Sequence, residues 1–419
     1  MARYHIETYG CTSNRGESRE IERALRDGGH HPADGPEAAD VAILNTCTVV
    51  EKTERNMLAR ARELDDETPA DLVITGCMAL AQGEQFREAD IDADVLHWDD
   101  VPEHVRNGEC PTVTPDTEPV VDGVVGILPI ARGCMSDCSY CITKHATGRI
   151  ESPTVEENVE KARALVHAGT KELRITGQDT GVYGWDRNQG ESLLPELLER
   201  ICTEIDGEFR VRVGMANPKG VHGVREELAA VFAEHDELYN FLHAPVQSGS
   251  DEMLADMRRQ HTVSEYVDVV ETFDEYLDYW TLSTDFIVGF PTEEPADHRQ
   301  SLALLRETRP EKINVTRFSK RPGTDAADMK GLGGQTKKDR SKEMSEVKMD
   351  VVGAAYESMV GQTSEVLLVE DGTDDSLVGY DSAYRQVAIP GAETAADLGD
   401  IAEAEITGHN TVYALGELV

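Results

Sequence analysis

The 419-residue chain is poor in basic and aromatic residues and has no long apolar run. Lys and Arg number 40 against 80 Asp and Glu, so the formal net charge is -40, and aromatic residues make up only 5%. No apolar stretch approaches the roughly 18 residues of a membrane span, and no secretory signal follows Met1. These absences argue against a membrane protein or a secreted disulfide scaffold, so we expect a cytoplasmic protein in a reducing compartment.

The acid excess does not predict disorder, because apolar periodic segments recur along the whole chain. Hydrophobic residues account for 39% of the sequence, and this length can form two or three domains with real cores. Acids spread from end to end are typical of a halophilic cytoplasm, where molar salt shortens the Debye length to about 3 Å and screens their repulsion. An acidic protein from ordinary salt is the alternative.

Three of the eight cysteines crowd into one short motif. Cys134, Cys138 and Cys141 form a C-x3-C-x2-C array directly after the apolar run 124–130, and no fourth cysteine lies nearby. Zinc sites normally have four protein ligands, whereas three thiolates can hold three irons of a cubane cluster and leave the fourth iron open. The spacing favours the cluster; a zinc site with a distant fourth ligand, or three unrelated cysteines, are the alternatives.

The N-terminal part, residues 1–106, alternates apolar strand patterns with helical ones. Strands at 4–9, 41–46 and 72–76 and helices at 17–29 and 51–64 predict an open parallel sheet with helices on its faces. Each strand ends at a cysteine, namely Cys11, Cys47 and Cys77. Because ligands bind at the carboxyl ends of such strands, these cysteines predict a second metal cluster, with buried structural cysteine as the alternative. Cys110 and Cys202 follow no strand and are expected to be incidental.

Residues 107–123 predict a linker, and residues 124–330 predict a second α/β domain. Its strands are expected at 124–130, 172–176, 209–213, 239–243, 282–288 and 312–318, with helices at 155–168, 193–205, 221–234, 264–279 and 295–308. Six βα units are fewer than the eight of a closed barrel, so the sequence predicts a partial (βα)6 barrel. Glycine-rich polar segments follow five of the strands, and unless they are ordinary turns they predict a pocket for a polar cofactor and a sizeable substrate.

The C-terminal part changes character twice. Residues 331–357 predict a charged helix with five basic residues, which is either a local basic patch or a solvated face. Residues 358–419 contain short alternating segments between glycine and aspartate turns, a pattern that predicts a small antiparallel β-barrel of the oligonucleotide-binding type.

Six motifs spread over the chain carry a family resemblance. They are Thr8–Cys11 with Asn14, and the segments 45–49, 75–77, 132–141, 243–248 and 285–293. Three separated cysteines ahead of the C-x3-C-x2-C array resemble the methylthiotransferases of the radical S-adenosylmethionine (SAM) superfamily over nearly the whole chain. The resemblance implies a methylthiotransferase domain, a radical SAM partial barrel and an RNA-binding TRAM barrel, in agreement with the three parts above.

The resemblance also implies roles for single residues. Cys134, Cys138 and Cys141 would hold a [4Fe–4S] cluster that generates a radical from SAM, and Cys11, Cys47 and Cys77 a second [4Fe–4S] cluster that takes part in sulfur delivery. One SAM molecule would supply the radical and another the methyl group. Tyr140, Gln178, Asn217 and Gln247 would form part of the SAM pocket, with Tyr140 beside the adenine.

Within the family, the segments 9–14, 144–145, 179–184 and 212–218 look most like the archaeal and eukaryotic branch. That branch adds a methylthio group at C2 of N6-threonylcarbamoyladenosine, at position 37 beside the tRNA anticodon. Arg149 departs from the family pattern, standing in a shifted register for its usual arginine. The alternatives are a methylthiotransferase for an aspartate of a ribosomal protein and a non-catalytic iron–sulfur regulator that binds RNA.

The expected partners are the tRNA anticodon stem-loop, an electron donor of the ferredoxin or flavodoxin type and a sulfur source. Because salt weakens phosphate contacts, we expect recognition by shape and by stacking of unpaired loop bases. We also expect Arg and Lys to gather on one face that spans the barrel rim, the helix at 331–357 and the C-terminal barrel.

Overall fold

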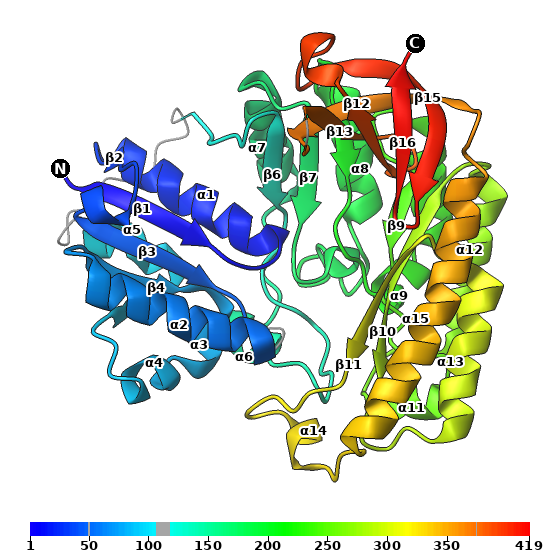
Figure 1. The fold of residues 1–419 in the computed structure, drawn as a ribbon, viewed down its shortest axis with the longest axis horizontal. Coiled ribbons are helices and arrows are strands. Elements are labelled where there is room, and N and C mark those ends of the chain that lie inside the picture. The colour runs from blue at the N-terminus through cyan, green and yellow to red at the C-terminus, as the bar shows by residue number, and fades with distance from the viewer. Residues whose placement is uncertain (49–50, 106–117, 374) are drawn as a thin grey trace.

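The computed structural model describes residues 1–48, 51–105, 118–373 and 375–419, which form three packed units (Figure 1). Most of the linker expected at 107–123, together with Cys110, lies outside these residues. The described part of the chain contains no helix that is both long and apolar enough to cross a bilayer.

The N-terminal unit is a parallel sheet with helices on both faces. Its five strands are β1 (Arg3–Thr8), β2 (His31–Pro32), β3 (Val41–Thr46), β4 (Asp71–Thr75) and β5 (Asp94–Val95), in the order β2-β1-β3-β4-β5. The helices α2 (Glu51–Glu67), α3 (Gly76–Gln82) and α4 (Glu84–Glu88) cover one face, and α1 (Thr12–Asp27) and α5 (Val101–Val105) cover the other. The central strand β3 is buried at every position, as its apolar sequence requires. The open parallel sheet is confirmed.

The middle unit is a partial barrel of six parallel strands. They are β6 (Val125–Pro129), β7 (Glu172–Thr176), β8 (Arg210–Arg212), β9 (Phe241–His243), β10 (Thr281–Val288) and β11 (Lys312–Arg317). Two sheets, β6-β7-β8 and β9-β10-β11, are joined by a parallel bridge between Val211 and Leu238. Within the described residues β6 and β11 do not pair, so the barrel is open between them, as the count of six units predicted.

Helices cover the outside of the barrel. They are α7 (Val155–His167), α8 (Leu194–Glu204), α10 (Arg225–Glu234), α12 (Val263–Tyr276) and α13 (Pro295–Thr308). The single helix expected at 221–234 is wrong: the chain forms α9 (Pro218–His222) and then α10, with Gly223 ending the first of them. Glycine has a low helix propensity, and here it marks a break in the apolar period.

The C-terminal unit is a closed five-stranded barrel. Its strands are β12 (Thr363–Asp371), β13 (Ser376–Tyr380), β14 (Gln386–Pro390), β15 (Ile401–Asn410) and β16 (Tyr413–Leu418), in the order β12-β13-β14-β16-β15. All neighbours are antiparallel except β14 and β16. The long helix α15 (Gly334–Glu357) runs from the end of β11 to this barrel, alongside α13 (Figure 1).

The two outer units close the middle barrel from different sides. Helix α1 packs on β6, where a Cβ on Gly16 would lie only 2.8 Å from Pro129 Cγ. From the C-terminal barrel, the turn after β13 reaches the amino ends of the barrel strands, and Tyr384 packs against the rings of Tyr239 and Phe241 at 4.8 and 5.0 Å. The carboxyl ends of the strands therefore face the N-terminal unit, and the amino ends face the C-terminal barrel.

Candidate active site

Six cysteines from two units line one cavity of about 430 Å³ at the carboxyl ends of the strands. Cys11, Cys47 and Cys77 come from the N-terminal unit, and Cys134, Cys138 and Cys141 from the loop after β6. None of the six forms a disulfide within the part of the chain that the structure describes. The structure thus brings together the two cysteine sets that the sequence singled out.

Glycines and amides hold the N-terminal cysteines at the strand ends. Gly10 and Gly76 have φ values of 136° and 87°, and a Cβ on Gly76 would lie 2.4 Å from the Thr46 backbone oxygen. Cys11 and Cys77 therefore each follow a turn that only glycine makes comfortably. Asn14 donates to Asn45 Oδ1 (3.0 Å), and its own Oδ1 lies 3.4 Å from Cys11 Sγ. This buried amide pair ties the turn at Cys11 to the end of β3.

Close backbone contacts fix the loop that carries the other three cysteines. A Cβ on Gly133, whose φ is 77°, would lie 2.0 Å from the backbone oxygen of Arg149. The amide N–H of Gly133 donates to Gln178 Oε1 (2.8 Å), and the Cys141 N–H donates to the Cys138 carbonyl (3.2 Å). The next helix, α6 (Thr143–Thr147), packs against α3, which carries Cys77. This helix contact sets the two cysteine groups face to face.

Burial makes three of the six thiols harder to deprotonate. It raises the pKa of Cys134 to about 11, and the pKa values of Cys77 and Cys138 are also raised, with burial as the largest cause. A metal ion binds the deprotonated thiolate and displaces the proton, so uncharged, closely grouped thiols are a donor set that iron can convert to ligands. Arg259 offers the compensating charge, with Nη1 3.5 Å from Cys138 Sγ. The residues present fit an iron–sulfur cluster.

The four residues expected in the SAM pocket all line the same cavity: Tyr140, Gln178, Asn217 and Gln247. Gln178 is held by its bond to Gly133, and Asn217 caps α9 while donating from Nδ2 to Ser136 Oγ (3.2 Å). Gln247 has a φ of 73°, and its N–H donates to the Asp285 carbonyl (2.8 Å). Their convergence is a finding; their contacts to a cofactor stay a prediction.

Two further residues of this cavity were missed as site residues. Asp179 is buried, accepts from the N–H groups of Asn217 (2.9 Å) and Gly181 (3.1 Å), and has no partner in the described chain for Oδ2. Its burial raises the pKa to about 6. Arg259 also donates to the Pro245 carbonyl (2.9 Å). Asp179 lies in a recognised polar segment, whereas nothing in the sequence around Arg259 marks it.

A second cavity, of about 720 Å³, opens from the first along the unpaired edge of β11. It shares Cys11, Tyr140 and Cys141 with the cysteine cavity and continues past Asn314 and Arg317 to Lys348 on α15. At the junction of the two cavities, the Asp285 carboxylate accepts from Asn314 Nδ2 (2.7 Å) and lies 3.3 Å from His243 Nε2. Burial opposes ionisation of Asp285, but these contacts and the charges around it hold its pKa below the usual value.

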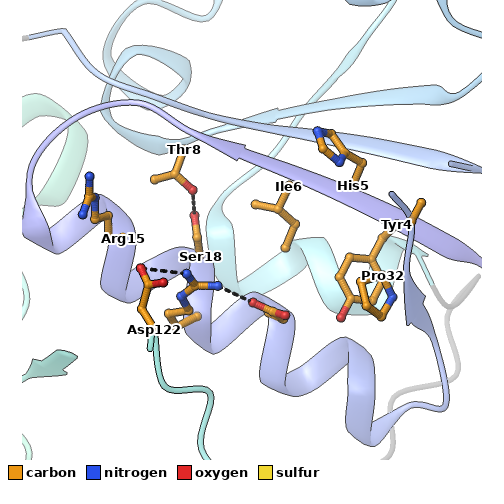
Figure 2. A pocket seen from close by; sticks show the side chains of 11 residues that line it. Tyr4, His5, Ile6, Thr8, Arg15, Ser18, Pro32 and Asp122 are labelled. Carbon is orange, nitrogen blue, oxygen red and sulfur yellow. Dashed lines mark hydrogen bonds and ion pairs between the residues drawn. The ribbon is translucent and has the colours of Figure 1, made fainter. Parts of the chain in front are cut away.

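Other candidate residues and hollows lie apart from this site. A cavity of about 260 Å³ beside β1 and α1 contains none of the six cysteines, and its polar groups bond to one another: Thr8 to Ser18 (2.8 Å) and Arg19 to Asp122 (3.0 Å) (Figure 2). Cys202 lies on α8, outside both the cysteine cavity and the second cavity. The Arg149 side chain is exposed and lines neither of them.

The expectation of one basic face is wrong over most of its extent. The C-terminal barrel, residues 358–419, has twelve acidic residues and one basic residue, Arg385, which is buried and pairs with Glu311 (2.5 Å). On α15 five basic residues are balanced by five acidic ones, and Arg340 is buried against Glu293 (2.6 Å). Of the expected basic face, only the part at the barrel rim is present, at the mouth of the second cavity.

Comparison with known proteins agrees with this division of the chain. Family models described as the Radical SAM superfamily, an uncharacterised protein family called UPF0004 and the TRAM domain match residues 128–305, 3–97 and 357–419. Two solved structures show the fold: the cobalamin-dependent SAM radical enzyme OxsB (TM-score 0.55, 11% identity, 84% of this chain and 56% of that one) and the radical SAM methyltransferase TsrM of Kitasatospora setae (TM-score 0.55, 14% identity, 78% and 76%).

Fold and site together define a radical SAM protein. At the level of sequence, an Archaeoglobus fulgidus protein named "Probable threonylcarbamoyladenosine tRNA methylthiotransferase" is 36% identical over 99% of this chain and 98% of its own length. The human "Threonylcarbamoyladenosine tRNA methylthiotransferase" is 30% identical over 99% of this chain and 73% of its own. The chain belongs to the threonylcarbamoyladenosine tRNA methylthiotransferase family.

Proposed function

We propose that this enzyme converts N6-threonylcarbamoyladenosine at position 37 of tRNA to its 2-methylthio derivative. The observation that supports this most directly is the meeting of two three-cysteine sets, from two units, in one cavity. A radical enzyme without sulfur insertion needs only the set at Cys134, Cys138 and Cys141. The second set supplies the place where sulfur can be held beside the radical source.

We assign two [4Fe–4S] clusters to these sets, with SAM bound between Tyr140, Gln178, Asn217 and Gln247. When bound, the open-iron cluster and SAM supply a carbon radical able to abstract hydrogen from C2 of the base. The chain's own residues position and shield these groups. Gln178 orients the cluster loop through the Gly133 N–H, and Arg259 offsets the thiolate charge at Cys138.

The remaining partners follow from this chemistry. Electrons would come from a donor of the ferredoxin or flavodoxin type, and sulfur from a separate source that reaches the second cluster. The names of the relatives favour tRNA over a ribosomal protein aspartate as the substrate. A tRNA substrate and the family membership favour a cytoplasmic protein.

The test separates the two cysteine sets after anaerobic reconstitution of the full chain. With SAM and a reductant, the wild type should form 5′-deoxyadenosine, and mass spectrometry of the treated tRNA should detect the methylthio nucleoside. Replacing Cys134, Cys138 and Cys141 by Ala should abolish both products. Replacing Cys11, Cys47 and Cys77 by Ala should abolish the methylthio nucleoside while 5′-deoxyadenosine still forms.

The controls address the alternatives. Cys202→Ala should behave as the wild type, because this thiol lies outside the cavity. A non-catalytic RNA-binding regulator would form no 5′-deoxyadenosine at all. An enzyme acting on a ribosomal protein would leave the tRNA nucleoside unchanged, and either result would refute the proposal.

A further inference from the structure

The second cavity is an electropositive inlet on an acidic protein. Among the described residues, three cationic side chains line it, Arg317, Arg321 and Lys348. The one carboxylate in the same lining, Asp285, already bonds to His243 and Asn314. Arg321 is engaged by Glu54 of the N-terminal unit at 2.8 Å. The cationic character of the inlet therefore rests on Arg317 and Lys348.

Lys348 has an unusual environment for this chain. It is half-buried beside the cavity, and within the described residues its ammonium makes no hydrogen bond or ion pair. Burial lowers the pKa of Lys348, and among the described residues no acid offsets this effect, although acids outnumber bases 80 to 40 in the sequence. A half-buried cation without a protein partner stabilises the fold little and is suited to an anionic ligand.

The neighbouring cations on α15 are used differently. Lys337 donates to the Phe318 carbonyl (3.1 Å), Arg340 pairs with Glu293 (2.6 Å), and Lys342 lies 3.6 Å from Glu346. Lys338 is exposed and lies outside the inlet. Lys348 thus differs from Lys337, Arg340 and Lys342 in having no partner among the described residues, and it differs from Lys338 in lining the inlet. Arg317, on the facing strand β11, likewise has no bond or ion pair among the described residues.

We propose that Lys348, assisted by Arg317, binds an oxyanion of the RNA substrate as the target nucleotide enters over the open edge of β11. This inference rests on the proposed function and adds to it an entry route and a binding site. The nucleotide offers two such oxyanions: the backbone phosphate next to it and the carboxylate of its threonylcarbamoyl group. Both are hydrogen-bond acceptors for an ammonium at the inlet, and both would draw the base toward the cysteine cavity.

The test measures binding of two fluorescent anticodon stem-loops to the reconstituted full chain. One RNA carries threonylcarbamoyladenosine at position 37 and the other carries plain adenosine. Lys348→Met, which keeps the apolar stem, should weaken binding of the modified RNA about tenfold, as expected for one charged hydrogen bond. A loss confined to the modified RNA identifies the carboxylate, whereas an equal loss for both RNAs identifies the phosphate.

Matched variants control the result. Lys338→Met removes an exposed cation from the same helix and should bind both RNAs as the wild type does, while Lys348→Arg should recover most of the affinity. The inference is overturned if Lys348→Met binds both RNAs normally, or if Lys338→Met loses as much; in either case wild-type methylthiolation would leave the proposed function standing. If the wild type neither binds nor modifies the RNA, the proposed function fails and this inference with it.

Discussion

The binding of tRNA to this protein should depend weakly on salt for an RNA-binding protein. The logarithm of affinity falls linearly with the logarithm of salt concentration, with a slope of about -0.7 per phosphate contact for single strands. The C-terminal barrel offers no free cation, since its only basic residue, Arg385, is buried against Glu311. Arg317 and Lys348, two cations whose side chains have no partner in the described part of the chain, line the inlet.

The two inlet cations determine how strongly RNA binding should depend on salt concentration. Two phosphate contacts, the most that these two cations can make, give a slope of about -1.4, so a roughly fourfold rise in KCl should weaken binding only about sevenfold or less. Eight contacts would give a slope of about -5.6 and a loss of more than roughly a thousandfold over the same range. The assay is fluorescence anisotropy of a labelled anticodon stem-loop, titrated at several KCl concentrations at which the protein stays folded.

A matched variant sharpens the measurement. In the double variant R317A/K348A the slope should approach zero, because both proposed contacts are gone. A wild-type slope steeper than about -4 would refute the reasoning, since it would require phosphate contacts from several cations outside the inlet.

Three further perturbations probe the scaffold. Arg385→Met should cost about 3 kcal/mol of unfolding free energy by leaving the half-buried Glu311 carboxylate without its counter-charge, and E311Q/R385M should recover part of it, both by denaturant titration. Gly133→Ala should block iron uptake by the cluster motif, because its Cβ would meet a backbone oxygen at 2.0 Å, whereas Gly123→Ala has open space and should load normally. Burial lowers the pKa of His261 to about 3, so below pH 6.5 the unfolded state binds a proton that the folded state does not bind. The free energy of unfolding should therefore drop by about 1.4 kcal/mol per pH unit toward pH 5, as measured by thermal melts. His261→Leu should remove this pH dependence.

The sequence predicts the site best where reactive residues come directly after a strand. Cys11, Cys47 and Cys77 each come directly after a buried apolar run, and parallel strands place such positions at one edge of the sheet. The structure brings them to the cysteine motif at 134–141, as the family motifs implied. Periodicity and position were sufficient here because both are local properties of the chain.

The sequence predicts poorly what depends on distant packing. Arg259 reaches Cys138 from a loop 121 residues away, and no local pattern marks it. The expectation that helix α15 contributes to a basic face was wrong for the same reason, because Arg340 pairs with Glu293 only in the folded chain. The strands β2 and β5 have two residues each, too short for a period to be detected.

The position of the C-terminal barrel gives it a role that needs no basic surface. Its turn after β13 lies at the amino ends of the middle barrel's strands, where the Lys312 ammonium lies 4.2 Å from the centroid of the Tyr384 ring. Burial lowers the pKa of Lys312 to about 7, as expected for a cation that water does not reach. The same turn is anchored by Arg385 on Glu311 and by Asp381 accepting from Tyr279 (2.6 Å). The C-terminal barrel thus covers the amino ends of the middle barrel's strands, opposite the ends that carry the cysteine cavity, and closing that side against solvent requires tight aromatic packing rather than positive charge.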